Sequence, residues 1–406
     1  MSPSQPLDGD TLHAWLHLAN ISLGPRLLTE LLAHFGGDPR RIFAATDAEL
    51  DPVPGFQARH LVRLRDGLLL PTDRQIAWVE KQGVWLAVLG QPEYPETLEI
   101  LPDAPPILFV RGTLLPEDSR SIGIVGSRHA TPYGRATAER LSRELAEQNV
   151  TVVSGGAVGI DASAHRGAIS GGGRTLAFLG CGLDVDYPRD NRHLFEQIVE
   201  HGATISESPL GAQPEAWRFP ARNRLISAMS LAVLVVEAPR KSGALITAGF
   251  AVDQGRPVLA VPGNIDRPSS EGCNDLLKDG ATLVTETVDI LRAVNLLPIA
   301  APSVQQGVLD LRERRPALET SPSMDEVPTL TAKPAAADPE LSAVWKSLSP
   351  VRRQLMEALT QTPQHLDQLS QRTGLPATEA GIEMIFLELD GLVRRLPGNT
   401  YIRTIG

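Results

Sequence analysis

Eight short runs of apolar and β-branched residues recur along the middle of the chain, and they constrain the fold more than any other feature. They are VWLAVL (84–89), ILFVRG (107–112), IGIVG (122–126), VTVVSG (150–155), TLAFLG (175–180), ATIS (203–206), LAVLVVEA (231–238) and PVLAVPG (257–263). Several are continuous rather than alternating, which is typical of strands buried on both faces. Helical patterns at 133–148, 161–170, 190–200 and 244–254 lie between them. The alternation predicts an α/β fold with a doubly wound, mostly parallel sheet.

The segment before this pattern reads as short helices without strands. Its residues 9–67 contain two similar stretches, ISLGPRLLTELLAHFGG and VPGFQARHLVRL, with Gly24 or Gly55 in a tight turn before a helix. Such hairpins expose backbone N–H groups at a helix start and can seat a nucleic-acid phosphate. A plain helical bundle explains the same glycines equally well. We expect an all-α module over residues 1–80 and the α/β domain over 81–296.

The segment after the pattern divides into two parts. Residues 297–340 are rich in proline and alanine and predict a flexible linker. Residues 341–406 contain three helical patterns and then PGNTYIRTI, the layout of a winged helix. Their basic and acidic residues nearly balance, and the third helical pattern carries Glu379, Glu383, Glu388 and Asp390. A protein contact is therefore at least as consistent with this module as DNA reading.

The overall charge and the cysteines exclude several classes of protein. The formal net charge is −10, which disfavours bulk attraction to nucleic acid or to a membrane, so any anion site must be local. Cys181 and Cys273 are far apart, which fits a reducing compartment and offers neither a disulfide framework nor a zinc site. No apolar run is long enough to span a membrane, and the N-terminus does not resemble a signal peptide. We expect a cytoplasmic protein without membrane contact.

Ligands of doubly wound sheets bind at the carboxyl ends of the strands, so the loops after each strand deserve most weight. Gly126, Ser127 and Arg128 follow one strand. The next strand is followed by SGGAVGID, which contains Gly155, Gly156 and Gly159. Glycine lets the backbone approach a ligand closely, and Asp161 is placed to cap the following helix. Together the two loops predict neighbouring anion-binding turns.

The loop CGLDVDYPRDN (181–191) allows two interpretations. Asp184 and Asp186 have the spacing of a carboxylate pair for metal binding or acid–base work. The alternative is a rigid proline-containing turn with capping aspartates. The turn is favoured, because no further His or Glu cluster completes a metal site.

Arginines and aromatic residues cluster in SESPLGAQPEAWRFPARNRLISAMS (206–230). Arg218, Arg222 and Arg224 stand there beside Trp217 and Phe219. This mixture suits a nucleic-acid strand, since rings stack on bases and guanidinium groups hold phosphates. The alternative is internal ion pairing with Glu207, Glu215 and Glu237. We favour the external anion, because Arg222 and Arg224 introduce an apolar helix at its dipole-positive end.

Residues for covalent or acid–base catalysis are missing from these loops. No Ser, Cys or His stands in an arrangement of nucleophile and base. His129 and His165 fall in the candidate cleft, but a single histidine more often caps or packs. We therefore predict a protein that is not an enzyme and needs no metal or cofactor.

The motifs IVGSR, SGGAVGIDASAHRGA, LGCGLDVDYPRDN, SESPLG…FPARNRLIS and VVEAPRKSGALITA…GRPVLAVPGN…GCNDLLKDGA resemble, in order and spacing, the DNA-processing protein A family (DprA, also called Smf). The resemblance covers residues 120–285 closely. It implies an extended Rossmann-like domain that binds single-stranded DNA, protects it and loads the RecA recombinase onto it. The implied setting is natural transformation and DNA recombination or repair, with a homodimer formed through the Rossmann-like domain.

The resemblance also implies a DNA pocket. Its residues are Gly126, Ser127, Arg128, Gly155, Gly156, Gly159, Phe219, Arg222, Asn223 and Arg224, with the turn Lys241, Ser242 and Gly243 as a neighbour. The arginine–aromatic segment itself adds Trp217 and Arg218 to the expected DNA-binding residues. A small nucleotide needs glycine at position 128 so that backbone can close over its phosphates. A DNA strand crossing the cleft needs a cation that reaches outward, which fits Arg128.

Two alternatives stay open on the sequence. A Rossmann-like nucleotide phosphoribohydrolase would carry a PGGxGTxxE motif, but the comparable turn here is APRKSGALITA and lacks the glutamate. A protein-interaction scaffold with a vestigial cleft is suggested by the acidic third helix of the winged module.

Overall fold

The chain is seen here in a computed structural model that describes residues 8–21, 23–67, 70–296, 348–360, 362–389, 392–396 and 400–404. The linker expected at 297–340 lies outside these described residues.

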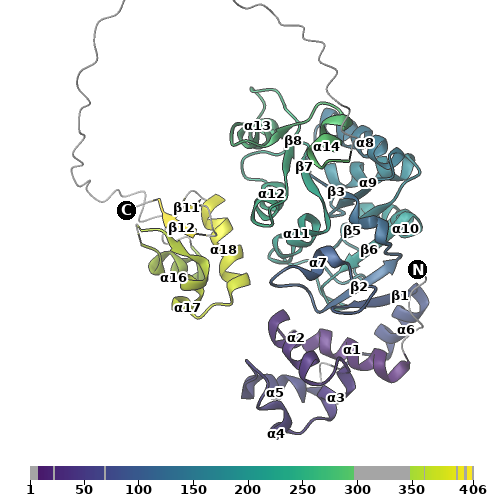
Figure 1. Cartoon of the computed structure of the whole chain (residues 1–406), viewed down its shortest axis with the longest axis vertical. Coiled ribbons are helices and arrows are strands. Elements are labelled where there is room, and N and C mark those ends of the chain that lie inside the picture. Colours follow the sequence, from purple (N-terminus) through teal and green to yellow (C-terminus); the bar gives the residue numbers. More distant parts are fainter. Residues whose placement is uncertain are drawn as a thin grey trace, which may run out of the picture.

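A nine-stranded sheet forms the centre of the structure (Figure 1). Its strands run in the order β1 (Val84–Val88), β2 (Ile107–Gly112), β6 (Gly202–Ser206), β5 (Thr175–Phe178), β4 (Thr151–Ser154), β3 (Ser121–Val125), β7 (Ala232–Val235), β8 (Val258–Ala260) and β9 (Thr282–Leu283). The β1–β2 and β2–β6 pairs are antiparallel and all the others are parallel. The predicted mostly parallel sheet is confirmed. Strand order reverses between β3 and β7, which is where such sheets bind ligands.

Helices cover both faces of the sheet (Figure 1). One face carries α8 (Pro132–Glu147), α9 (Ile160–Ser170), α10 (Arg192–His201) and α14 (Thr287–Ala293). The other carries α7 (Glu96–Glu99), α11 (Arg218–Met229), α12 (Gly243–Asp253) and α13 (Glu271–Lys278). Short 3₁₀ turns are η2 (Pro116–Ser119), η3 (Arg189–Asn191) and η4 (Pro268–Ser270). Of the helices described, none is long and apolar enough to cross a membrane.

The strand β7 shows why the apolar runs are continuous. Side chains alternate across a strand, so Val233 and Val235 pack beneath α11 and α12, whereas Ala232 and Leu234 pack against the α8–α9 layer. All four are fully buried. Burial on both faces removes the polar alternation that a half-exposed strand would show.

The N-terminal helices are α1 (Gly9–Ile21), α2 (Pro25–His34), α3 (Pro39–Ala44), α4 (Asp47–Leu50), α5 (Ala58–Leu64) and α6 (Asp73–Gln82). The division expected at residue 80 falls near the turn between α6 and β1. The apolar core crosses that division, because Leu18 and Leu31 belong to one cluster with Ile107 and Phe109 of β2 and with Leu210. The helical module therefore packs on one face of β1 and β2, the antiparallel strands at the edge of the sheet.

The C-terminal module is a winged helix, as predicted. It contains α16 (Pro350–Ala358), α17 (Leu366–Thr373), α18 (Ala377–Leu389) and a sheet ordered β10 (Gln364–His365), β12 (Thr400–Arg403), β11 (Val393–Leu396). Two of its acidic residues are used internally: Glu383 pairs with Arg352 at 2.5 Å, and Glu388 accepts the backbone N–H of Arg395. The Arg395 side chain forms an ion pair with Asp253 of α12.

His165 is a packing residue, as the sequence favoured. It is fully buried on α9, with Nδ1 2.7 Å from the Thr175 hydroxyl oxygen. That hydroxyl donates its own proton to the carbonyl of Val152 at 2.8 Å, so Nδ1 must be the protonated nitrogen and the donor. Burial lowers the pKa of His165 to about 3.

We expect this histidine to make stability depend on pH. Above about pH 6.5 the imidazole is neutral in both the folded and the unfolded chain. Below that value it binds a proton in the unfolded chain but stays neutral in the folded one. The free energy of unfolding should therefore fall as the pH drops toward about 3. Between pH 7.5 and 5 the His165 contribution is about 2 kcal/mol. Urea unfolding at both pH values measures how much the free energy of unfolding falls from pH 7.5 to pH 5. This fall should be smaller in His165→Asn by about 2 kcal/mol. An identical fall in both proteins would show that His165 is not the group responsible.

Candidate nucleic-acid interface

Glu237, just beyond β7, fixes the turn that follows β3. Its buried carboxylate accepts hydrogen bonds from the backbone N–H of Thr131 at 3.1 Å and from the Thr131 hydroxyl at 2.5 Å. Its carbonyl accepts the N–H of Ser127 at 2.7 Å. The loops after β3 and β7 are thus joined at the point where strand order reverses, and Arg128 is held at the surface beside this junction.

The two glycine turns lie against each other, as predicted. The N–H of Ile160 donates to the carbonyl of Ser127 at 3.2 Å. Gly159 has φ of 84°, and a Cβ there would come within 2.3 Å of the Ser127 carbonyl oxygen. A Cβ on Gly126 would come within 2.5 Å of the Ile160 side chain. Neither position has room for a larger residue, so both glycines are needed for this close approach of backbone.

Arg222 lies beneath the turns rather than on the surface. Its side chain is buried, and Nη1 donates to the carbonyl of Gly155 at 2.6 Å and to the carbonyl of Phe178. It therefore joins the carboxyl ends of β4 and β5. Burial lowers the pKa of Arg222 to about 10 and raises the pKa of Asp161, its buried counter-charge. Asp161 is not the helix cap expected from the sequence but accepts the N–H of Ala157 at 3.3 Å.

Arg224 is also buried and has two carboxylate partners. Nε donates to Asp103 at 2.7 Å and Nη2 to Glu207 at 2.8 Å. Burial opposes its charge, but the two carboxylates outweigh burial and raise the pKa of Arg224. The preference for an external anion at Arg222 and Arg224 rested on a helix start that is wrong, since α11 begins at Arg218. The alternative of internal pairing holds for Arg224, whose partners include Glu207. Arg222 and Arg224 therefore position the site.

Arg128 is the exposed residue of the site, and the half-buried rings of Phe219 and Tyr187 lie beside it. The Arg128 guanidinium carbon lies 4.9 Å from the centre of the Phe219 ring, and the Tyr187 ring centre is 5.5 Å from that of Phe219. Phe219 packs over Gly180, where a Cβ would come within 2.8 Å of the ring. Within the described part of the chain, Arg128 has no ion pair and no side-chain hydrogen bond. Together with Gly155 and Arg222, these residues line one small pocket.

The remaining predicted residues lie outside this pocket. Asn223 donates to the carbonyl of Gly243 at 3.2 Å, and the Ser242 hydroxyl accepts the N–H of Ala244 to cap α12. Lys241 is exposed in the same turn. Further along, Trp217 is half exposed, with the guanidinium of Arg218 4.3 Å from its ring. Gly156, with φ of 66°, packs against Phe195.

The sequence did not single out Tyr187 or Gly180. Both follow β5 at the carboxyl edge of the sheet, and that position is the signal that could have found them. Attention went to the aspartates of the same loop, which the structure uses differently. Asp184 accepts the N–H of Gly211 at 2.7 Å, and Asp186 is 3.7 Å from Arg192. No cluster of three metal-binding side chains occurs among the described residues.

The chain is similar in sequence and in structure to known proteins. A family model described as DNA recombination-mediator protein A matches residues 85–295, and one described as the DprA winged helix domain matches 331–399. Protein Smf of Synechocystis sp. is 35% identical over 396 residues, covering 96% of this chain and 98% of the relative. Protein Smf of Escherichia coli is 34% identical over 397 residues, covering 96% and 95%. The X-ray structure of DNA processing protein A from Streptococcus pneumoniae has a TM-score of 0.59 at 32% identity, covering 68% of this chain and 95% of that one.

The positioning role of Arg222 predicts a stability effect. Arg222→Ala leaves Asp161 and two carbonyls without their buried cation, so the free energy of unfolding should fall by about 3–5 kcal/mol. Arg218→Ala is the matched control from the same helix. It removes a pair with the exposed Glu215 and should cost about 1 kcal/mol or less. Urea denaturation measures both, and equal small losses would show that Arg222 is not a structural cation.

Proposed function

The chain belongs to the DNA recombination-mediator protein A family, and we propose that it binds single-stranded DNA at the carboxyl edge of its parallel sheet and loads RecA onto that DNA. One observation carries the proposal. Arg128 stands at the surface where strand order reverses, without a carboxylate partner in the described chain and above the ring of Phe219. A guanidinium beside an aromatic ring supplies both contacts that a single strand needs, one for phosphate and one for a base.

The chemistry favours a single strand over a duplex. Stacking on Phe219 requires a base whose face is free, and the faces are covered within a duplex. The net charge of −10 provides no general attraction, so binding should rest on a few local cations. Each phosphate that these cations neutralise should add about 0.7 to the slope of log affinity against log salt.

The other predicted residues take supporting parts in this proposal. The glycines Gly126, Gly155, Gly156 and Gly159 let the backbone approach the strand. Arg222 and Arg224 hold the turns in place from inside. Asn223, Lys241 and Gly243 extend the surface in this proposal, as do Trp217 and Arg218. The buried hydroxyls of Ser127 and Ser242 accept backbone N–H groups of their own loops and hold the turns.

The hydrolase alternative finds no suitable carboxylate at the turn after β7. Glu237 is the acidic residue there. Its carboxylate oxygens accept hydrogen bonds from Thr131, and its backbone carbonyl accepts one from Ser127.

The setting that we propose is natural transformation and recombination or repair, with a homodimer formed through the Rossmann-like domain.

The DNA contact can be tested with Arg128→Ala. Loss of one charge-assisted phosphate contact should weaken binding of a labelled single strand by about tenfold or more. The slope of log affinity against log salt should become shallower by about 0.7. Fluorescence anisotropy at several salt concentrations, with single-stranded and duplex oligonucleotides, gives both quantities.

Arg292→Ala is the control, because it removes an exposed arginine from α14 rather than from the carboxyl-edge loops. It should bind as the natural protein does. Equal affinity of Arg128→Ala and the natural protein, or no preference for single strands, would refute the proposed site.

RecA loading is tested separately. RecA hydrolyses ATP only slowly at first on DNA coated with single-strand binding protein, and a loading protein should shorten this lag. We expect the natural protein and Arg292→Ala to shorten it and Arg128→Ala to fail. Tight DNA binding without any shortening would leave the DNA site intact and exclude loading.

A further inference from the structure

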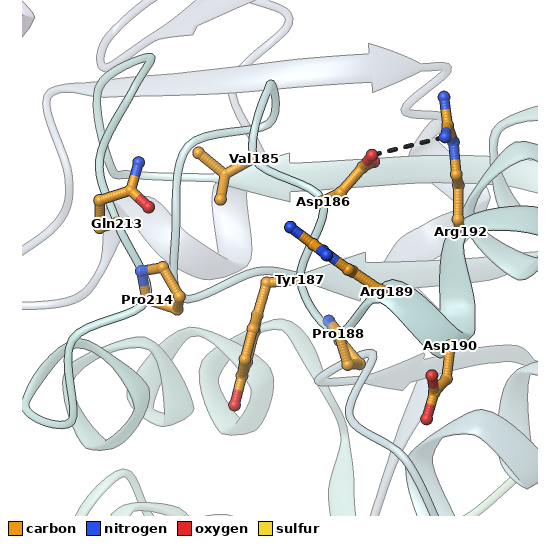
Figure 2. Close-up of a pocket in the computed structure, with 9 residues that line it drawn as sticks. All are labelled: Val185, Asp186, Tyr187, Pro188, Arg189, Asp190, Arg192, Gln213 and Pro214. Atoms are coloured by element: carbon orange, nitrogen blue, oxygen red, sulfur yellow. Dashed lines mark ion pairs between the residues drawn. The ribbon is translucent and has the colours of Figure 1, made fainter.

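A second pocket adjoins the one that contains Arg128 and Phe219. It has a volume of about 760 Å³ and is lined by residues 185–190, by Arg192 at the start of α10, and by Gln213 and Pro214 (Figure 2). Tyr187 and Pro188 line both pockets, so the two form neighbouring parts of one surface. The loop was considered in the sequence only for its aspartates, and nothing in the site described above uses its arginines.

Tyr187 stands at the wall between the two pockets. Its ring is half-buried, and its plane is tilted by 43° from that of Phe219 at a centre distance of 5.5 Å. Two adjacent rings at this spacing provide consecutive apolar surfaces for unpaired bases.

Arg189 supplies a second uncommitted cation. Figure 2 shows its side chain crossing the pocket between Asp186 on one side and Tyr187 with Pro188 on the other. No ion pair and no side-chain hydrogen bond of Arg189 occurs among the residues that the structure describes. The Asp190 carboxylate points the other way in the same view. The pocket therefore presents a guanidinium that no carboxylate neutralises.

Two aspartates, Asp186 and Asp190, line the pocket together with the two arginines. Asp186 is 3.7 Å from Arg192, so these two charges largely balance each other. The Asp190 carboxylate points away from the Arg189 side chain. Arg189 is therefore the cation of this lining that is left for an anion.

We propose that this pocket binds the next segment of the single strand held by Arg128 and Phe219. In this arrangement Tyr187 stacks on a base and Arg189 binds a phosphate. The path then alternates as a cation, two rings and a cation, which is the composition that suits unpaired nucleic acid of any sequence. The inference rests on the proposed function, because it extends the same strand.

Oligonucleotide length separates the second pocket from the first. Two labelled oligothymidylates of about 4 and about 16 nucleotides span the usual range of single-strand site sizes. The short one should fill only the surface at Arg128 and Phe219, and the long one should reach Arg189. Arg189→Ala should weaken binding of the long strand by about fivefold or more and leave the short strand within about twofold.

Two further variants sharpen the measurement. Tyr187→Ala should weaken the long strand and Tyr187→Phe should restore it, since the ring and not the hydroxyl stacks. Arg143→Ala is the control for the loss of one positive charge, because Arg143 is an exposed arginine of α8 that lines neither pocket. It should leave both strands unaffected.

The outcomes distinguish this inference from the proposed function. If Arg128→Ala weakens both lengths but Arg189→Ala weakens neither, the second pocket is excluded and the first stands. Equal weakening of both lengths by Arg189→Ala would also overturn the extension, since Arg189 would then act on the first pocket. If the natural protein binds neither strand, both proposals fail.

Discussion

The candidate interface depends on one buried cation. Arg222 donates to carbonyls at the ends of two neighbouring parallel strands, β4 and β5, and Asp161 balances its charge in the interior. This contact leaves no room for a side chain at Gly155, where a Cβ would come within 2.7 Å of both charged groups. It also fixes α11 against the sheet edge, so that Phe219 covers Gly180. The exposed residues can be few and simple because the buried ones set their positions.

The arginines of this region fall into a buried group and an exposed group, which have different roles. Arg222 and Arg224 have their hydrogen bonds satisfied inside the protein, whereas Arg128 and Arg189 have no carboxylate partner in the described chain. The buried arginines therefore hold the loops in place, and the two exposed ones are left for an external anion in the proposed interface.

The sequence predicted the sheet because burial on both faces leaves a direct mark, a continuous apolar run. It also predicted that two glycine turns meet, because parallel strands end at the same edge. It offered Glu207 as an internal partner but not Asp103, since Arg224 and Asp103 are 121 residues apart and no local pattern indicates such a pairing. The start of α11 was placed too late because no capping side chain marks Arg218. Tyr187 was overlooked because the aspartates beside it have a more familiar chemistry.

The shared core between the helical module and the sheet has a consequence for synthesis of the chain. Leu18 and Leu31 pack in one cluster with Phe109 and with Leu210, although these residues span half of the sequence. All the other buried members of this cluster lie between Leu12 and Phe109, so the helices can bury most of their apolar surface against one another and against β1 and β2 early in synthesis. Only the part that packs on Leu210 stays uncovered until that residue is made, and that part is open to aggregation during the interval.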